Sequence, residues 1–158
     1  MTVVSERPSP APWPPIVYLA AAALAVGLHL WMPLPWLGTP AADLLFVIGL
    51  LLCAFALAID VFALRTLWRA GTTVMPHRPS AHLVTDGPFS FTRNPIYLGN
   101  TLLMIGAGLV AGVLWLVLLA PAAAFATQKL AIEGEERHLA DRFGKRYRDY
   151  QKKVRRWI

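Results

Sequence analysis

The sequence has little charge and almost no cysteine. Only 15% of its 158 residues are charged, whereas 56% are hydrophobic. This balance excludes an ordinary soluble domain and indicates a single integral-membrane unit, residues 1–158. The one cysteine, Cys53, excludes an intramolecular disulfide.

Metal-ligand patterns are also missing. His29 lies in an apolar segment, and His77 and His82 lie in a polar stretch. None of the three stands at a ligand spacing from Cys53, so we expect no metal site.

Four apolar segments are present, at about residues 16–32, 44–64, 96–110 and 113–127. The last two form an almost unbroken apolar run. As one helix this run would be about 48 Å long, against a hydrocarbon core of about 30 Å. We therefore expect a helical hairpin that turns at Gly106, Gly108 and Gly112. The expected fold class is all-α integral membrane, with four transmembrane helices.

Lys and Arg are absent from two of the loops between these segments. Of the 15 Lys and Arg residues, ten follow Gln128, four lie between the second and third apolar segments, and one precedes the first. The loops at about 33–40 and 108–112 contain none. Because cytoplasmic loops are enriched in Lys and Arg, this distribution predicts cytoplasmic N- and C-termini and a cytoplasmic loop at about 70–95.

The chain after Gln128 carries a net charge of +5, from ten basic and five acidic residues. Five apolar residues recur there every three or four positions: Leu139, Phe143, Tyr147, Tyr150 and Val154. This pattern predicts an amphipathic C-terminal cytoplasmic helix at about 133–156, which Gly144 could interrupt, lying against the bundle or the bilayer. Its expected partner is anionic lipid headgroups, at about 1 kcal/mol per nearby basic residue, and not nucleic acid.

Asp60 is an acidic residue within the second apolar segment. An ionised carboxylate near the bilayer centre costs about 2.5 to 3.5 kcal/mol, and less near the interface. Two interpretations stay open: pairing with Arg65 or another nearby donor, and a direct role in ligand binding. The second supports an alternative function, a small multi-span transporter or channel subunit that uses Asp60.

A polar stretch rich in turn-forming residues, Leu83 to Gly99, lies between the second and third apolar segments. Asp86-Gly87-Pro88 and Asn94-Pro95 are turn sequences, and the residue before each proline is disfavoured in the α region. Irregular backbone between two membrane-length segments indicates a site, with Arg93 just before a helix that begins near Pro95.

Four motifs, taken in order, resemble those of a known group of proteins. They are Thr85-Asp86-Gly87-Pro88-Phe89, Arg93-Asn94-Pro95-Ile96-Tyr97-Leu98-Gly99, Glu135-Glu136-Arg137-His138-Leu139 and Phe143-Gly144-Lys145-Arg146-Tyr147-Arg148-Asp149-Tyr150. The group is the integral-membrane methyltransferases of the isoprenylcysteine carboxyl methyltransferase and phospholipid methyltransferase type. The resemblance covers roughly residues 70–156 and implies a bacterial inner-membrane enzyme. It also implies methyl transfer from S-adenosyl-L-methionine to a membrane lipid or another lipophilic or small amphiphilic substrate at the cytoplasmic face.

The resemblance further implies that the loop and the Glu pair enclose the cofactor from two sides. Arg93 and the helix start at Pro95 suit the cofactor's carboxylate, while Glu135 or Glu136 suits its ammonium. These two Glu residues are also the candidate catalytic residues. The expected cofactor-binding set is Leu83, Val84, Gly87, Phe89, Arg93, Asn94, Pro95, Tyr97, Gly99, Glu135 and Glu136.

Two positions depart from the pattern of that group. Asn94 stands where the group usually has His, and an amide carries no proton at neutral pH. Ala131 stands four residues before Glu135, where the resemblance leads us to expect Arg, and Lys129 lies on another helix face. We therefore expect poor methylation of isoprenylcysteine carboxylates and a preference for a neutral or amine-type amphiphile.

Overall fold

The structure, a computed structural model, describes residues 13–71 and 82–158. Its helices are α1 (Trp13–Trp31), α2 (Ala41–Arg69), the short 3-10 helix η1 (Gly87–Ser90), α3 (Pro95–Ala111), α4 (Leu114–Thr127), the π-helix η2 (Gln128–Ile132), α5 (Glu133–Phe143) and α6 (Lys145–Lys153). The described residues include no strand. The all-α prediction is therefore confirmed for this part of the chain.

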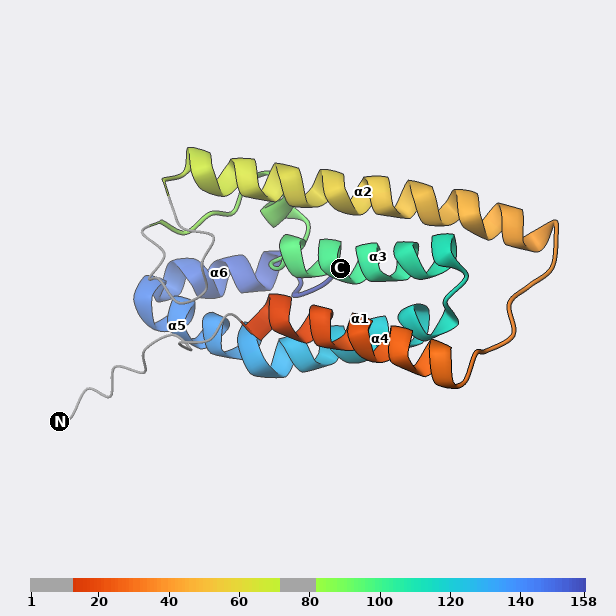
Figure 1. Ribbon diagram of the computed structural model, residues 1–158. Coiled ribbons are helices and arrows are strands. Elements are labelled where there is room, and N and C mark those ends of the chain that lie inside the picture. The colour runs from red at the N-terminus through yellow and green to blue at the C-terminus, as the bar shows by residue number, and fades with distance from the viewer. Residues whose placement is uncertain (1–12, 72–81) are drawn as a thin grey trace.

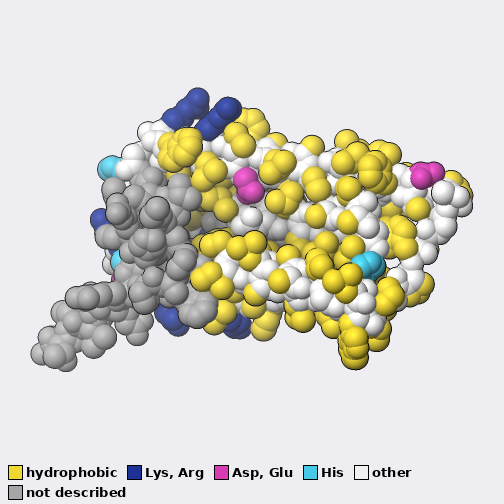
Figure 2. All heavy atoms as spheres, in the orientation of Figure 1, with side chains coloured by type: hydrophobic (Ala, Val, Ile, Leu, Met, Phe, Trp, Pro, Cys, Tyr) yellow, Lys and Arg dark blue, Asp and Glu magenta, His cyan; other side chains and the backbone are white. Residues whose placement is uncertain are grey.

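Helices α1 to α4 lie side by side as a bundle, and α5 and α6 lie together at one end of it (Figure 1). Within the bundle α2 packs along α3, and α4 packs against both α3 and α1. Apolar side chains cover much of the bundle surface shown in Figure 2. Many large apolar side chains of the bundle are exposed, Leu51 of α2 among them. A surface of this kind suits contact with lipid.

Three helical segments are long and apolar enough to cross a membrane: Pro14–Trp31, Ala41–Arg69 and Leu114–Phe143. The last of these is continuous through α4, η2 and α5. The remaining apolar helix, α3, has 17 residues and is shorter. The structure therefore supports an integral membrane protein, and the count of four spans stays a prediction.

The chain reverses between α3 and α4 at Gly112, whose φ of 69° lies in the left-handed region. The prediction that Gly106 and Gly108 also form the turn is wrong, because both lie inside α3. A Cβ on Gly106 would lie 2.7 Å from the Sγ of Cys53 and 2.9 Å from the backbone oxygen of Gly49. These glycines instead allow α3 to approach its neighbours closely.

The C-terminal region consists of two helices and not one. Gly144, at φ 54° and ψ −122°, separates α5 from α6 and has a backbone conformation that favours glycine. The apolar stripe turns inward: Tyr147, Tyr150 and Val154 are buried and pack with partly buried Leu83, Leu139, Ala140 and Phe143. The apolar face therefore packs against the loop before α3 and against α5, and not against the bilayer.

Candidate functional site

Tyr97 and Glu135 form the first contact of the site. The Tyr97 hydroxyl on α3 donates to Oε1 of Glu135 on α5 at 2.8 Å. The backbone oxygen of Tyr97 accepts from the hydroxyl of Tyr18 on α1 at 3.2 Å, and that hydroxyl also lies 2.6 Å from Oγ1 of Thr101. Three helices thus meet at Tyr97 and hold the Glu135 carboxylate in place.

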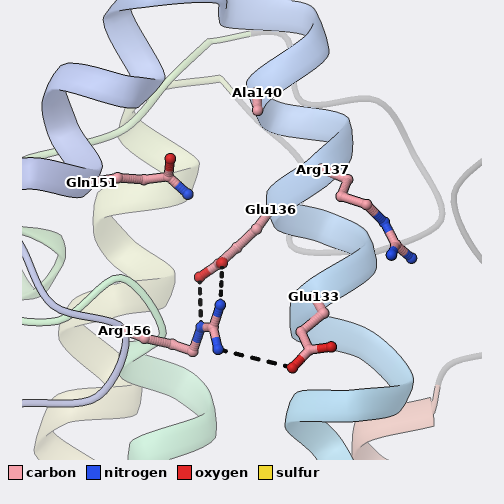
Figure 3. Close-up of a pocket in the computed structure, with 6 residues that line it drawn as sticks. All are labelled: Glu133, Glu136, Arg137, Ala140, Gln151 and Arg156. Atoms are coloured by element: carbon pink, nitrogen blue, oxygen red, sulfur yellow. Dashed lines mark hydrogen bonds and ion pairs between the residues drawn. The ribbon is translucent and has the colours of Figure 1, made fainter.

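Glu136 faces two guanidinium groups. Arg93 Nη2 lies 3.1 Å from Oε1. Arg156 donates from Nε to Oε1 at 3.0 Å and from Nη2 to Oε2 at 2.7 Å (Figure 3). The Glu136 side chain is only 10% exposed and that of Arg93 11% exposed. The hydrogen bond to Glu136 raises the pKa of Arg156, so this guanidinium stays charged. Close ion pairing offsets the cost of burying these charges.

The polypeptide after α6 is bound to the loop before α3. The backbone N–H of Arg93 donates to the oxygen of Arg155 at 3.0 Å. The Thr92 hydroxyl and the Asn94 amide both donate to the oxygen of Arg156, at 3.0 and 2.9 Å. The polar groups at the start of α3 that we expected to bind a cofactor thus include two that already bind the C-terminal segment.

The two buried tyrosines of α6, Tyr147 and Tyr150, hold this helix against the loop before α3. The Tyr150 hydroxyl donates to the oxygen of Phe89 at 2.6 Å. Burial raises the pKa of Tyr150 to about 12 and also raises the pKa of Tyr147. Both phenols therefore remain protonated at neutral pH, and that of Tyr150 ties α6 to η1.

Two pockets lie beside the C-terminal segment. The first, of about 290 Å³, has charges of both signs and is lined by Glu133, Glu136, Arg137, Ala140, Gln151 and Arg156 (Figure 3). The second, of about 360 Å³, is largely apolar and is lined by Thr101, Pro121, Ala124, Phe125, Gln128 and Trp157. The Trp157 indole donates to Oε1 of Gln128 at 2.9 Å. The adjacent residues Arg156 and Trp157 therefore each border a different pocket.

The π-helix η2 joins α4 to α5 directly before the Glu residues of the site. The Glu133 N–H donates to the oxygen of Gln128, so the bonds here span five residues and not four. π-Helical turns inside α-helices occur frequently at functional sites. Ala131 lies within this turn and is only 7% exposed, so the position where we expected Arg is a packed one.

The structure brings together five of the residues predicted from the sequence: Arg93, Asn94, Tyr97, Glu135 and Glu136. Two others, Gly87 and Gly99, lie against α2, because a Cβ would contact Thr66 at Gly87 and the Asp60 carboxylate at Gly99. Leu83 packs with the buried tyrosines of α6, and Pro95 is fully buried. For these residues the structure shows a packing role, and cofactor contact stays a prediction.

Asp60 lies beside Gly99, away from the ion pairs of Glu136. Its Oδ1 is buried and has no hydrogen-bond partner in the described part of the chain. Among those same residues Arg65 forms no ion pair with Asp60, so the first of the two interpretations, pairing with Arg65, is not seen there, and the role in ligand binding stays a prediction.

Sequence reasoning missed Arg156, Trp157 and Gln128. In the sequence, Arg155 and Arg156 stand out only as two of the ten basic residues after Gln128. A signal was available, since an Arg-Trp pair directly after an amphipathic helix combines a carboxylate partner with an interfacial aromatic side chain. The contacts that give them a role join segments far apart in the sequence, which no periodic pattern reveals.

A family model described as phospholipid methyltransferase matches residues 44–146, well over half of the chain. The matched range includes Arg93, Tyr97, Glu135 and Glu136 and ends before Arg156. No curated protein and no solved structure matched the chain. The family match agrees with the apolar helical bundle and with the polar contacts between α3 and α5, and the chain therefore belongs to the phospholipid methyltransferase family.

Proposed function

We propose that the protein transfers a methyl group from S-adenosylmethionine to a lipophilic or small amphiphilic acceptor at the cytoplasmic face of the membrane. One observation carries the proposal: the Tyr97–Glu135 and Arg93–Glu136 contacts converge within the family-matched range, at one end of an apolar bundle. Polar groups held in this way next to lipid-facing helices suit a reaction between a polar donor and a membrane-bound acceptor.

The residues present fit this cofactor. Its methionyl group carries an ammonium and a carboxylate, and the site offers carboxylates at Glu135 and Glu136 and a guanidinium at Arg93. The Tyr97 ring offers an aromatic face to the sulfonium, an attraction of about 0.5 to 2 kcal/mol. When bound, the cofactor supplies a methyl group activated by the positively charged sulfur.

The protein's own contribution is alignment of the two reactants, because methyl displacement needs no protein nucleophile. Glu135 has one further role if the acceptor is an amine. In this proposal its carboxylate, which accepts a hydrogen bond from the Tyr97 hydroxyl, takes the proton that the methylated amine loses. The buried Ala131 provides no charge for a carboxylate acceptor, which supports the preference for a neutral or amine-type amphiphile.

We also propose a topology of four spans with both ends cytoplasmic. The loop at 33–40 joins α1 to α2 at the opposite end of the bundle from α5 and α6 (Figure 1). Reporter fusions at the C-terminus should therefore read cytoplasmic, and one at Gly38 should read outside. A cytoplasmic signal at Gly38 would contradict the topology. Several basic side chains of α6, including Lys145 and Arg148, are exposed and available to anionic lipid headgroups.

The alternative function, a transporter or channel subunit, has one observation in its favour, the unpartnered Oδ1 of Asp60. It gives no role to the Tyr97–Glu135 and Arg93–Glu136 contacts. Binding of S-adenosylhomocysteine by the purified protein separates the two functions, because a transporter of this kind has no need of a site for it.

The activity test uses radiolabelled methyl transfer from S-adenosylmethionine to an extract of membrane lipids and, in parallel, to a farnesylcysteine analogue. We expect transfer to the lipid extract, a loss of at least about tenfold in Glu135→Gln, and near-normal activity in Asp141→Asn. Asp141 lies exposed on the same helix, so this variant controls for loss of one negative charge. Efficient turnover of the farnesylcysteine analogue would overturn the proposed acceptor class.

A further inference from the structure

The Glu136 carboxylate already binds two cations in this structure, Arg93 and Arg156. On the proposed function, the ammonium of the cofactor binds at Glu135 or Glu136, and binding at Glu136 brings it to these same oxygens. A carboxylate has room for several donors, but Arg156 takes both oxygens of Glu136. The ammonium therefore competes with the two guanidinium groups for these oxygens.

Arg156 is the partner that can leave. Its side chain is 31% exposed, whereas that of Arg93 is 11% exposed. Arg93 is also fixed by its position between η1 and α3. Arg156 belongs to the segment Val154–Ile158 that follows α6. The backbone oxygens of Arg155 and Arg156 are bound by the loop before α3, so it is the Arg156 side chain that moves, and its pair with Glu136 is the more exposed of the two. If Arg156 moves away, Glu136 keeps Arg93 and is not left uncompensated.

The pocket beside Glu136 also indicates that Arg156 is the group that moves. The charged pocket measures about 290 Å³, just below the range of about 300 to 1,000 Å³ for small-molecule sites. Arg156 lines this pocket, and Trp157 lines the apolar one next to it. The C-terminal segment thus contributes one side chain to the charged pocket and the next one to the apolar pocket.

We propose that Val154–Ile158 is a strap that closes the site, in which Arg156 occupies the carboxylate that the cofactor's ammonium takes. When the cofactor binds, the Arg156 side chain leaves Glu136. The hydrogen bond from the neighbouring Trp157 indole to Gln128 then breaks. Movement of the Arg156 and Trp157 side chains connects the charged pocket with the apolar pocket, so an acceptor in the apolar pocket can reach the methyl group. The cofactor consequently binds before the acceptor. This inference rests on the proposed function.

The first test measures S-adenosylhomocysteine affinity by calorimetry on the detergent-purified full chain. We expect Arg156→Gln to bind about tenfold more tightly, because the competitor for Glu136 is gone. The matched control is Arg155→Gln, which removes the same charge from a neighbouring exposed side chain and should change affinity less than about twofold. Thermal unfolding should show that both variants remain folded.

Unchanged or weaker binding by Arg156→Gln would overturn the strap, since it would make Arg156 a permanent support of Glu136. The proposed function survives that result if the unmodified protein binds S-adenosylhomocysteine. If neither the unmodified protein nor Arg156→Gln binds it, the proposed function fails, and the strap fails with it.

A second measurement follows the strap itself. A spin label on Ile158→Cys, in a Cys53→Ala background, reports the mobility of a side chain that is 80% exposed. We expect the label to become more mobile when S-adenosylhomocysteine is added, and to be mobile without it in the Arg156→Gln variant. A label whose mobility does not change on saturating binding would contradict displacement of the strap.

Discussion

The interface between α2 and α3 and the end of the bundle around Glu136 are held together in opposite ways. Along α2 and α3 small residues bring two apolar helices into direct contact, with Gly106 against Cys53 and the backbone of Gly49. Around Glu136, ion pairs and hydrogen bonds join α3, α5 and the C-terminal segment. The α2–α3 interface depends on close packing and leaves no room for a larger side chain. The region around Glu136 depends on charge, and one ionic partner there can be replaced by another.

The largest effect is expected from Glu136→Gln. This change leaves Arg93, whose side chain is 11% exposed, beside Arg156 without the carboxylate that compensates both. Breaking a buried ion pair from one side costs about 3 to 5 kcal/mol of unfolding free energy. Thermal unfolding in detergent should show a large loss of stability. The matched control, Glu133→Gln, affects a more exposed carboxylate, which Lys129 contacts at 2.7 Å and Arg156 at 3.9 Å, and should cost much less.

A smaller loss is expected when the packed interface is overfilled. In Gly106→Ala the added Cβ meets Cys53 and the backbone of Gly49, and we expect a cost of about 1 to 3 kcal/mol. Gly27 of α1 is the control, because a Cβ there has nothing within 4 Å. Gly27→Ala should be neutral or slightly stabilising. Equal stability of the two variants would remove the contrast between the two regions.

The sequence predicted the part of the site that is local. Arg93, Asn94 and Tyr97 lie on one short stretch at a helix start, and Glu135 and Glu136 are neighbours, so a resemblance over short motifs identifies them. The hydrogen bond between Tyr97 and Glu135 shows that the two stretches are in contact, and their enclosure of a cofactor stays a prediction.

The remaining features depend on long-range packing. Arg156 reaches Glu136 only because Tyr150 and Val154 dock α6 beneath the loop before α3. Neither the amino-acid composition nor the hydrophobic periodicity predicts that the segment after α6 lies beside Glu136. The predicted turn extended too far toward the N-terminus, since it included Gly106 and Gly108 along with Gly112, because glycine serves both for reversal at Gly112 and for close packing at Gly106.

The buried position of Ala131 also changes how acceptor preference is best tested. An arginine at this packed position would lack room, so Ala131→Arg would report on folding before it reported on carboxylate recognition. Comparing acceptors on the unmodified protein avoids this difficulty.

The most direct measurement of the central claim is calorimetric binding of S-adenosylhomocysteine to the unmodified protein and to Arg93→Ala and Glu135→Ala. We expect the unmodified protein to bind and each variant to lose about 1.5 to 3 kcal/mol, the value of a charge-assisted hydrogen bond. Both variants should remain folded, since Glu136 retains Arg156 in the first and all its partners in the second. Unchanged affinity in both folded variants would contradict a cofactor site between α3 and α5.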